Sequence, residues 1–135
     1  MIWALDRTTP SRIKLSKLDP LCVLDEMDGP RLFTLRDDDG QLFLAYMCGE
    51  DETTERFLIV PTSDRIVSTI QENKISLRDA LTQQAIMAVV DRRPDDVLSE
   101  PVLVDSSDLP STALPRPNTF LSGGFNTEVQ RLTWS

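Results

Sequence analysis

Three runs rich in aliphatic and aromatic residues lie in the first half of the chain, at residues 31–36, 41–48 and 56–60. The first two flank residues 37–40, which read Asp-Asp-Asp-Gly. An Asp-Gly step between two such runs is a strong hairpin signal, because glycine accepts the positive φ that the turn requires. A second acidic turn, 49–55, leads into the third run, which ends at Pro61. The pattern predicts a three-stranded antiparallel meander with an acidic turn at each tip.

Apolar side chains occupy both faces of this predicted sheet. In the second run, Leu42 and Leu44 alternate with Phe43 and Ala45, so that neither face is polar. Two short helices can cover one face of a small sheet. We expect strands within residues 12–24 and a proline-containing segment near the C-terminus to cover the other face. The alternative is that a partner covers it.

The segment after Pro61 predicts two short helices. Thr62 or Ser63 can cap the first, which carries three branched aliphatic residues on one stripe and ends near Asn73. Ser76 can cap the second helix. Further short strands are predicted where apolar residues alternate or form continuous runs, at 12–16, 21–24, 85–90 and 102–104.

These elements predict an α+β fold, in which an antiparallel sheet of four to six strands carries two short helices on one face. We expect this domain to span residues 1–104. Prolines and serines then indicate that residues 105–135 form an extended C-terminal arm. Near its end the arm has the spacing of a short amphipathic helix, with apolar residues at Phe125, Val129 and Leu132.

The composition is typical of a soluble globular protein, with 40% hydrophobic and 27% charged residues in 135. This length is enough for one core. No apolar run approaches the ~20 residues of a membrane helix, and the first residues lack the pattern of a signal peptide. We therefore expect a cytoplasmic protein that does not bind a membrane.

The absence of histidine excludes Ser-His-Asp and Cys-His catalysis within this chain, as well as Cys/His zinc fingers. Phosphate-binding and nucleophile-elbow motifs are also absent from the sequence. Cys22 and Cys48 stand among apolar neighbours, so we expect two reduced, buried thiols. We predict that the protein is not an enzyme, has no catalytic residue, and binds no cofactor.

The net charge of −8 is unevenly distributed along the chain. Residues 25–55 contain ten acidic and two basic residues, which equals the whole excess. Such a surface repels nucleic acid and anionic membranes. The acidic turns lack the spacing of a calcium-binding loop, because Leu35 stands where its first ligand belongs. We therefore expect neither direct nucleic-acid binding nor a metal site.

Several motifs in this order resemble a family of short, uncharacterised bacterial domains. The resemblance covers roughly residues 20–121 and rests on Gly29-Pro30-Arg31-Leu32-Phe33, Asp38-Asp39-Gly40, 56–63, 75–81, Leu109-Pro110 and Leu114-Pro115. It implies a bacterial source and a compact α+β domain. It assigns no activity and no site residue.

The function we predict is that of a non-catalytic protein-protein interaction module, an accessory or regulatory subunit of a bacterial complex. Aromatic and aliphatic anchors dominate interface energetics. The expected partner-binding residues therefore lie on the arm: Phe120, Leu121, Phe125, Val129, Leu132 and Trp134. A second copy of the chain, bound through the second sheet face, is an alternative partner.

The alternative function is that of an acidic inhibitor of antitoxin or DNA-mimic type. Such a protein blocks a basic catalytic or nucleic-acid-binding surface on its target. The residues that would carry this function are those of the two acidic turns: Asp37, Asp38, Asp39, Glu50, Asp51 and Glu52.

Overall fold

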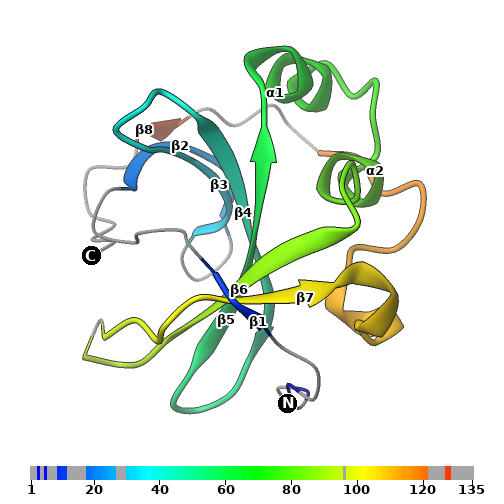
Figure 1. Cartoon of the computed structure of the whole chain (residues 1–135). Helices are drawn as coiled ribbons and strands as arrows, with labels where there is room; N and C mark the ends of the chain where they lie inside the picture. The colour runs from blue at the N-terminus through cyan, green and yellow to red at the C-terminus, as the bar shows by residue number, and fades with distance from the viewer. Residues whose placement is uncertain are drawn as a thin grey trace.

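The computed structural model describes residues 3, 5, 9–11, 18–26, 30–95, 97–121 and 127–128. Within these residues, eight strands form one antiparallel sheet in the order β1-β7-β6-β5-β4-β3-β2-β8. Figure 1 shows that the sheet is strongly twisted, with helices α1 and α2 beside it. The elements are β1 Thr9–Pro10, β2 Asp19–Glu26, β3 Pro30–Arg36, β4 Leu42–Glu50, β5 Glu55–Thr62, α1 Asp64–Gln71, α2 Leu77–Leu81, β6 Ile86–Arg92, β7 Val102–Asp105 and β8 Thr127–Glu128.

The α+β architecture with two short helices is confirmed, but the expected four to six strands are too few. Both outermost strands have only two residues. A two-residue strand is too short to show the alternation by which strands are recognised in a sequence. The two outermost strands are therefore defined by the strands with which they pair and not by a local sequence pattern.

The predicted hairpin and meander are confirmed. Strands β3 and β4 pair from Leu32↔Tyr46 to Arg36↔Leu42, and Gly40 between them has a φ of 85°. Strands β4 and β5 pair along nearly their whole lengths. The acidic turns at 37–41 and 51–54 close the two hairpins.

Two prolines lie within strands, although Pro61 was expected to end its strand. Pro61 is part of β5, opposite Phe43 of β4. The pairing of β5 with β6 ends at Ile59↔Ala88, so no β6 residue is registered opposite Pro61, and its missing N–H is not needed there. Pro20 likewise lies inside β2, opposite Leu35 of β3.

Both helices begin where the sequence predicts. The Ser63 hydroxyl accepts the backbone N–H of Ile66 at the start of α1, and the Ser76 hydroxyl accepts that of Asp79 at the start of α2. These bonds satisfy amide groups that have no partner within the helix. Asn73 follows α1 with a φ of 59°, the left-handed conformation expected at a helix end.

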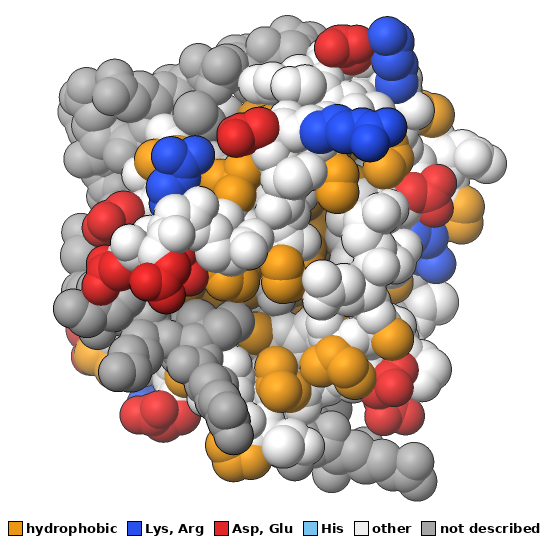
Figure 2. All heavy atoms as spheres, turned by 45° about the horizontal axis from the view of Figure 1, so that its top comes forward, with side chains coloured by type: hydrophobic (Ala, Val, Ile, Leu, Met, Phe, Trp, Pro, Cys, Tyr) orange, Lys and Arg blue, Asp and Glu red, His pale blue; other side chains and the backbone are white. Residues whose placement is uncertain are grey.

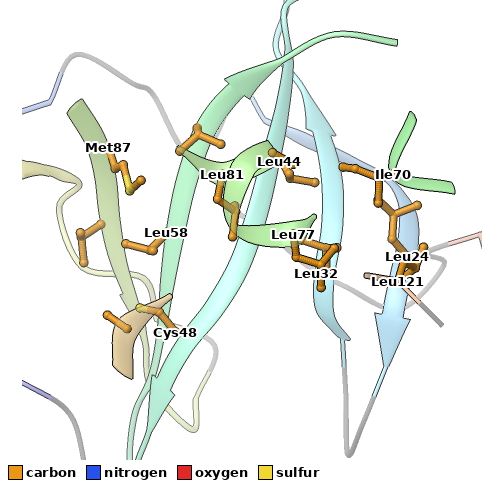
Figure 3. Close-up of a cluster of buried hydrophobic side chains, with 14 of the residues drawn as sticks. Leu24, Leu32, Leu44, Cys48, Leu58, Ile70, Leu77, Leu81, Met87 and Leu121 are labelled. Atoms are coloured by element: carbon orange, nitrogen blue, oxygen red, sulfur yellow. The ribbon is translucent and has the colours of Figure 1, made fainter. Parts of the chain in front are cut away.

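One hydrophobic cluster fills the space between the sheet and the helices. It joins strand side chains such as Leu44 and Leu58 to Ile70 of α1 and to Leu77 and Leu81 of α2 (Figure 3). The proline-containing segment is the described part of the predicted arm, residues 105–121. Its residues Ala113 and Leu121 are buried in the same cluster.

The proline-containing segment therefore covers the helix side of the sheet, not the second face as expected. The Arg78 guanidinium of α2 donates to the carbonyl oxygens of Pro115, at 2.7 Å, and Ser111, at 3.3 Å. The Leu77 N–H donates to the Thr119 carbonyl at 2.8 Å. These bonds fix residues 111–119 against α2, because they satisfy the segment's backbone carbonyls at the helix surface.

A second hydrophobic cluster lies on the other face of the sheet. It includes Phe33, Ala45, Phe57, Ile59 and Ala88, each at most 2% exposed. Leu18, just before β2, belongs to it as well. The predicted strand at 12–16, which was expected to contribute cover here, lies outside the described residues.

The C-terminal end differs from the predicted amphipathic helix where it is described. Thr127 and Glu128 are extended and pair with Val23 and Cys22 of β2. The apolar residues of the predicted helix lie outside the described residues. Neither helix in the described part of the chain is long and apolar enough to cross a membrane.

Candidate functional site

A groove of about 910 Å³ opens on the second face of the sheet, next to the β3–β4 turn. Its apolar lining comes from segments far apart in the sequence: Pro10, Leu18, Phe43, Ile59, Pro61, Ile86, Ala88 and Leu103. Its acidic rim consists of Asp37, Asp38 and Asp39. Figure 2 shows acidic side chains gathered beside hydrophobic side chains on one face of the molecule.

The strand register builds the floor of this groove. Ile59 of β5 lies opposite Ala88 of β6, which lies opposite Leu103 of β7. Residues in register on neighbouring antiparallel strands place their side chains on the same face. Ala88 stands between two long aliphatic residues, and its short side chain leaves depth in the middle of the row.

The floor residues Ile59 and Ala88 are buried, whereas the side chain of Ile86 beside them is exposed to solvent. Ile59 and Ala88 are 0% and 2% exposed, whereas Ile86 is 45% exposed. Ile86 begins β6 and lies opposite Asp105 of β7. A large aliphatic side chain with this exposure, beside an apolar groove, offers contact area to a ligand.

The acidic rim is held by a fixed turn. One carboxylate oxygen of Asp37 accepts the backbone N–H groups of Asp39, at 2.9 Å, and Gln41, at 2.8 Å. The side chains of Asp38 and Asp39 are exposed. No lysine or arginine is among the described residues that line the groove. The rim therefore places formal negative charge beside an apolar surface.

The second acidic turn lies at the other end of β4. The Asp51 carboxylate accepts backbone N–H groups from Thr53 and Thr54, both at 2.8 Å. The hydrogen bond from the Thr53 N–H is the main cause that lowers the pKa of Asp51. Because β4 has nine residues, the two turns are about 30 Å apart. The structure thus does not bring Asp37, Asp38 and Asp39 together with Glu50, Asp51 and Glu52.

The predicted arm residues have different positions. Phe120 is 44% exposed, whereas Leu121 is 3% exposed and packs in the helix-side core. Leu121 therefore stabilises this domain and offers no free contact surface. Phe125, Val129, Leu132 and Trp134 lie outside the described residues.

A buried ion pair that sequence reasoning missed joins β5 to β6. The Arg56 guanidinium donates to both carboxylate oxygens of Asp91, at 2.6 and 2.9 Å. It also donates to the Trp3 carbonyl and lies 4.7 Å from the centre of the Trp3 ring. The two paired residues are 35 positions apart, so no local motif signals them. This cluster ties the start of the chain to the sheet.

Cys48 is a free, buried thiol, as expected. Burial raises its pKa to about 12, although the positive charge of Arg56 acts in the opposite direction. A thiol with such a pKa stays protonated and is a poor nucleophile. The side chain of Cys22 is not among those described.

No group of histidine, cysteine, aspartate or glutamate side chains in the described ranges is arranged to hold a metal ion. The groove is thus built from apolar residues, the three aspartates and the uncharged polar residues Thr9, Ser11 and Gln84, a composition suited to contact and charge pairing.

Comparison with known proteins gives a family. A family model for DUF6575, a family of unknown function, matches residues 8–92. This match confirms the expected resemblance to an uncharacterised domain family, although it begins earlier and ends earlier than the expected 20–121. No curated protein and no solved structure matches the chain.

Proposed function

The chain belongs to DUF6575, and from that premise we propose that it is a non-catalytic protein-protein interaction module that binds a partner in the groove beside the β3–β4 turn. It acts as an accessory or regulatory subunit in a bacterial cytoplasm. The observation that carries this proposal is an apolar groove of about 910 Å³ with three aspartates on its rim.

The groove suits binding because its parts are fixed before a partner arrives. Its floor is made of paired strands, and its rim is a turn closed by the Asp37 carboxylate. A surface that needs little ordering loses less free energy on association. Its volume of about 910 Å³ is also in the range of protein ligand-binding clefts, roughly 300–1,000 Å³.

The groove is a better candidate than the described part of the arm. Leu121 is committed to the core, and residues 111–119 are bonded to α2. Phe120 keeps an exposed ring and remains a predicted contact. The four arm residues outside the described ranges remain predictions as well.

The separation of the acidic turns favours an interaction module over an acidic inhibitor. A protein that imitates nucleic acid needs a continuous row of negative charge, because it replaces regularly spaced phosphates. The turns at the two ends of β4 do not form such a row. Only one of them borders the groove.

Site-specific photo-crosslinking in bacterial cells of the native host tests the proposal. A photoreactive phenylalanine analogue is placed at Ile86 in the groove or, as a control, at Val97, which is 48% exposed outside it. We expect a discrete crosslinked protein from position 86 and none from position 97. Crosslinking from position 97 alone, or from neither position, contradicts the proposal.

A further inference from the structure

We infer that the occupant of the groove is a segment of a partner protein in which an aliphatic or aromatic residue stands next to a lysine or arginine. This inference rests on the proposed function and specifies the chemistry of the partner. Three observations carry it: the apolar floor, the charge of the rim and the net charge of the chain.

The floor selects an apolar side chain. Phe43, Ile59, Ala88 and Leu103 line it, and Ile86 rises beside it. A polar side chain placed there would lose its hydrogen bonds to water without gaining a partner from these residues. An aliphatic or aromatic side chain would instead bury its surface and that of Ile86.

The rim selects a positive charge next to that apolar side chain. Asp37, Asp38 and Asp39 are the charged residues among the described lining. The nearest arginine along the chain, Arg36, is directed to Asp64 of α1, with 4.0 Å between Nη2 and Oδ1. A cationic partner residue would complement this potential, and an anionic one would be repelled.

The same charge disfavours a second copy of the chain as the occupant. Each copy carries a net charge of −8. A dimer formed through this face would bring two such copies together, with no lysine or arginine among the described groove residues to offset the charge. We therefore assign the groove to a different protein with basic residues.

Selection from a displayed library of random peptides tests the inference on the full chain. We expect enriched peptides to share an apolar residue adjacent to lysine or arginine. The best peptide is then synthesised with a fluorescent label, together with a counterpart in which glutamate replaces each basic residue. Charge reversal should weaken binding on the order of tenfold or more.

Matched variants assign the binding to the groove. Asp39→Lys should lower the affinity for the basic peptide. Glu52→Lys, at the tip of the other hairpin, should leave this affinity unchanged. Ile86→Ser should weaken it, and Val97→Ser should not. All four side chains are exposed, so thermal melts should show that each variant folds.

Three results would overturn the inference. Enriched peptides without basic residues would remove its charge component while leaving the proposed function intact, provided that position 86 still crosslinks to a partner. If the library yielded no peptides that bind the wild-type chain better than the Ile86→Ser variant, the groove would not be a peptide-binding site. Self-association abolished by Ile86→Ser would assign the groove to a second copy.

Discussion

The rings of Phe33 and Phe57 meet edge to face, with their centres 5.7 Å apart and their planes at 72°. They belong to β3 and β5, which are separated by β4. Ala45 of β4 lies opposite Phe33 and on the same face. Its short side chain leaves the space in which the two rings meet, and this contact anchors the face that carries the groove.

Enlarging Ala45 should therefore destabilise the protein. Ala45→Leu places extra atoms in a fully buried site, and we expect a loss of about 1–3 kcal/mol in the free energy of unfolding. Ala85→Leu is the matched control, because Ala85 is exposed and should change stability by less than about 0.5 kcal/mol. Urea denaturation measures both values. Equal losses in the two variants would show that Ala45 is not constrained by its neighbours.

The ion pairs of the sheet should differ in importance. Asp91→Asn leaves the buried Arg56 guanidinium without its carboxylate, so we expect a loss of about 3 kcal/mol. Glu50→Gln disrupts a more exposed pair, in which Arg31 Nη2 lies 3.3 Å from Glu50 Oε1. This change should lower the free energy of unfolding by at most about 1 kcal/mol. Urea denaturation compares the variants. The interpretation fails if Asp91→Asn is as mild as Glu50→Gln.

Cys48 should be unreactive in the folded protein. In a Cys22→Ser background, an alkylating reagent at pH 8 should label Cys48 only after denaturation, because the folded thiol is buried and its pKa is about 12. Rapid labelling of the native protein would contradict its burial.

The same thiol predicts a pH dependence. The pKa of Cys48 is raised from 9.0 to about 12 on folding, so its contribution to stability is complete below pH 9 and falls as the pH rises toward 12. Between these values the unfolded thiol ionises and the folded thiol does not. Wild type should therefore lose more stability than Cys48→Ala in this window, as measured by urea denaturation. Parallel losses would rule out this linkage.

Helices and hairpins were predictable because their signals are local. Ser63 and Ser76 lie three residues before the amides they cap, and Gly40 lies within the turn it permits. The two-residue strands could not be predicted, since only pairing defines them. Pro61 showed a related limit, because its place inside β5 depends on where β6 stops pairing.

The site was predictable only in part. The acidic turn 37–39 and the apolar second face were both visible in the sequence. Their meeting in one groove depends on the register that brings Ala88 and Leu103 beside Ile59. The Arg56–Asp91 pair has the same origin. Such contacts join positions tens of residues apart, and one sequence contains no local record of them.

Removing the proline-containing segment should unfold the protein. A chain that ends at Val104 loses Ala113 and Leu121 from the core and the carbonyl acceptors of Arg78. A large buried aliphatic side chain contributes roughly 1.5–3 kcal/mol, a substantial share of the stability of a small domain. A chain that ends at Leu121 keeps these contacts and is the control. Circular-dichroism melts should show a cooperative transition for the control alone, and a cooperative melt of the shorter chain would contradict the packing of this segment.

The most direct test of groove binding is an NMR titration of the isotope-labelled full chain with the selected basic peptide. Amide signals of Asp39, Phe43, Ile86 and Leu103 should shift as the peptide binds, because these residues line the groove. Signals near Val97 and Glu52 should stay unchanged. Shifts confined to residues 119–135, or to the turn 50–54, would place the peptide elsewhere and contradict the proposed site.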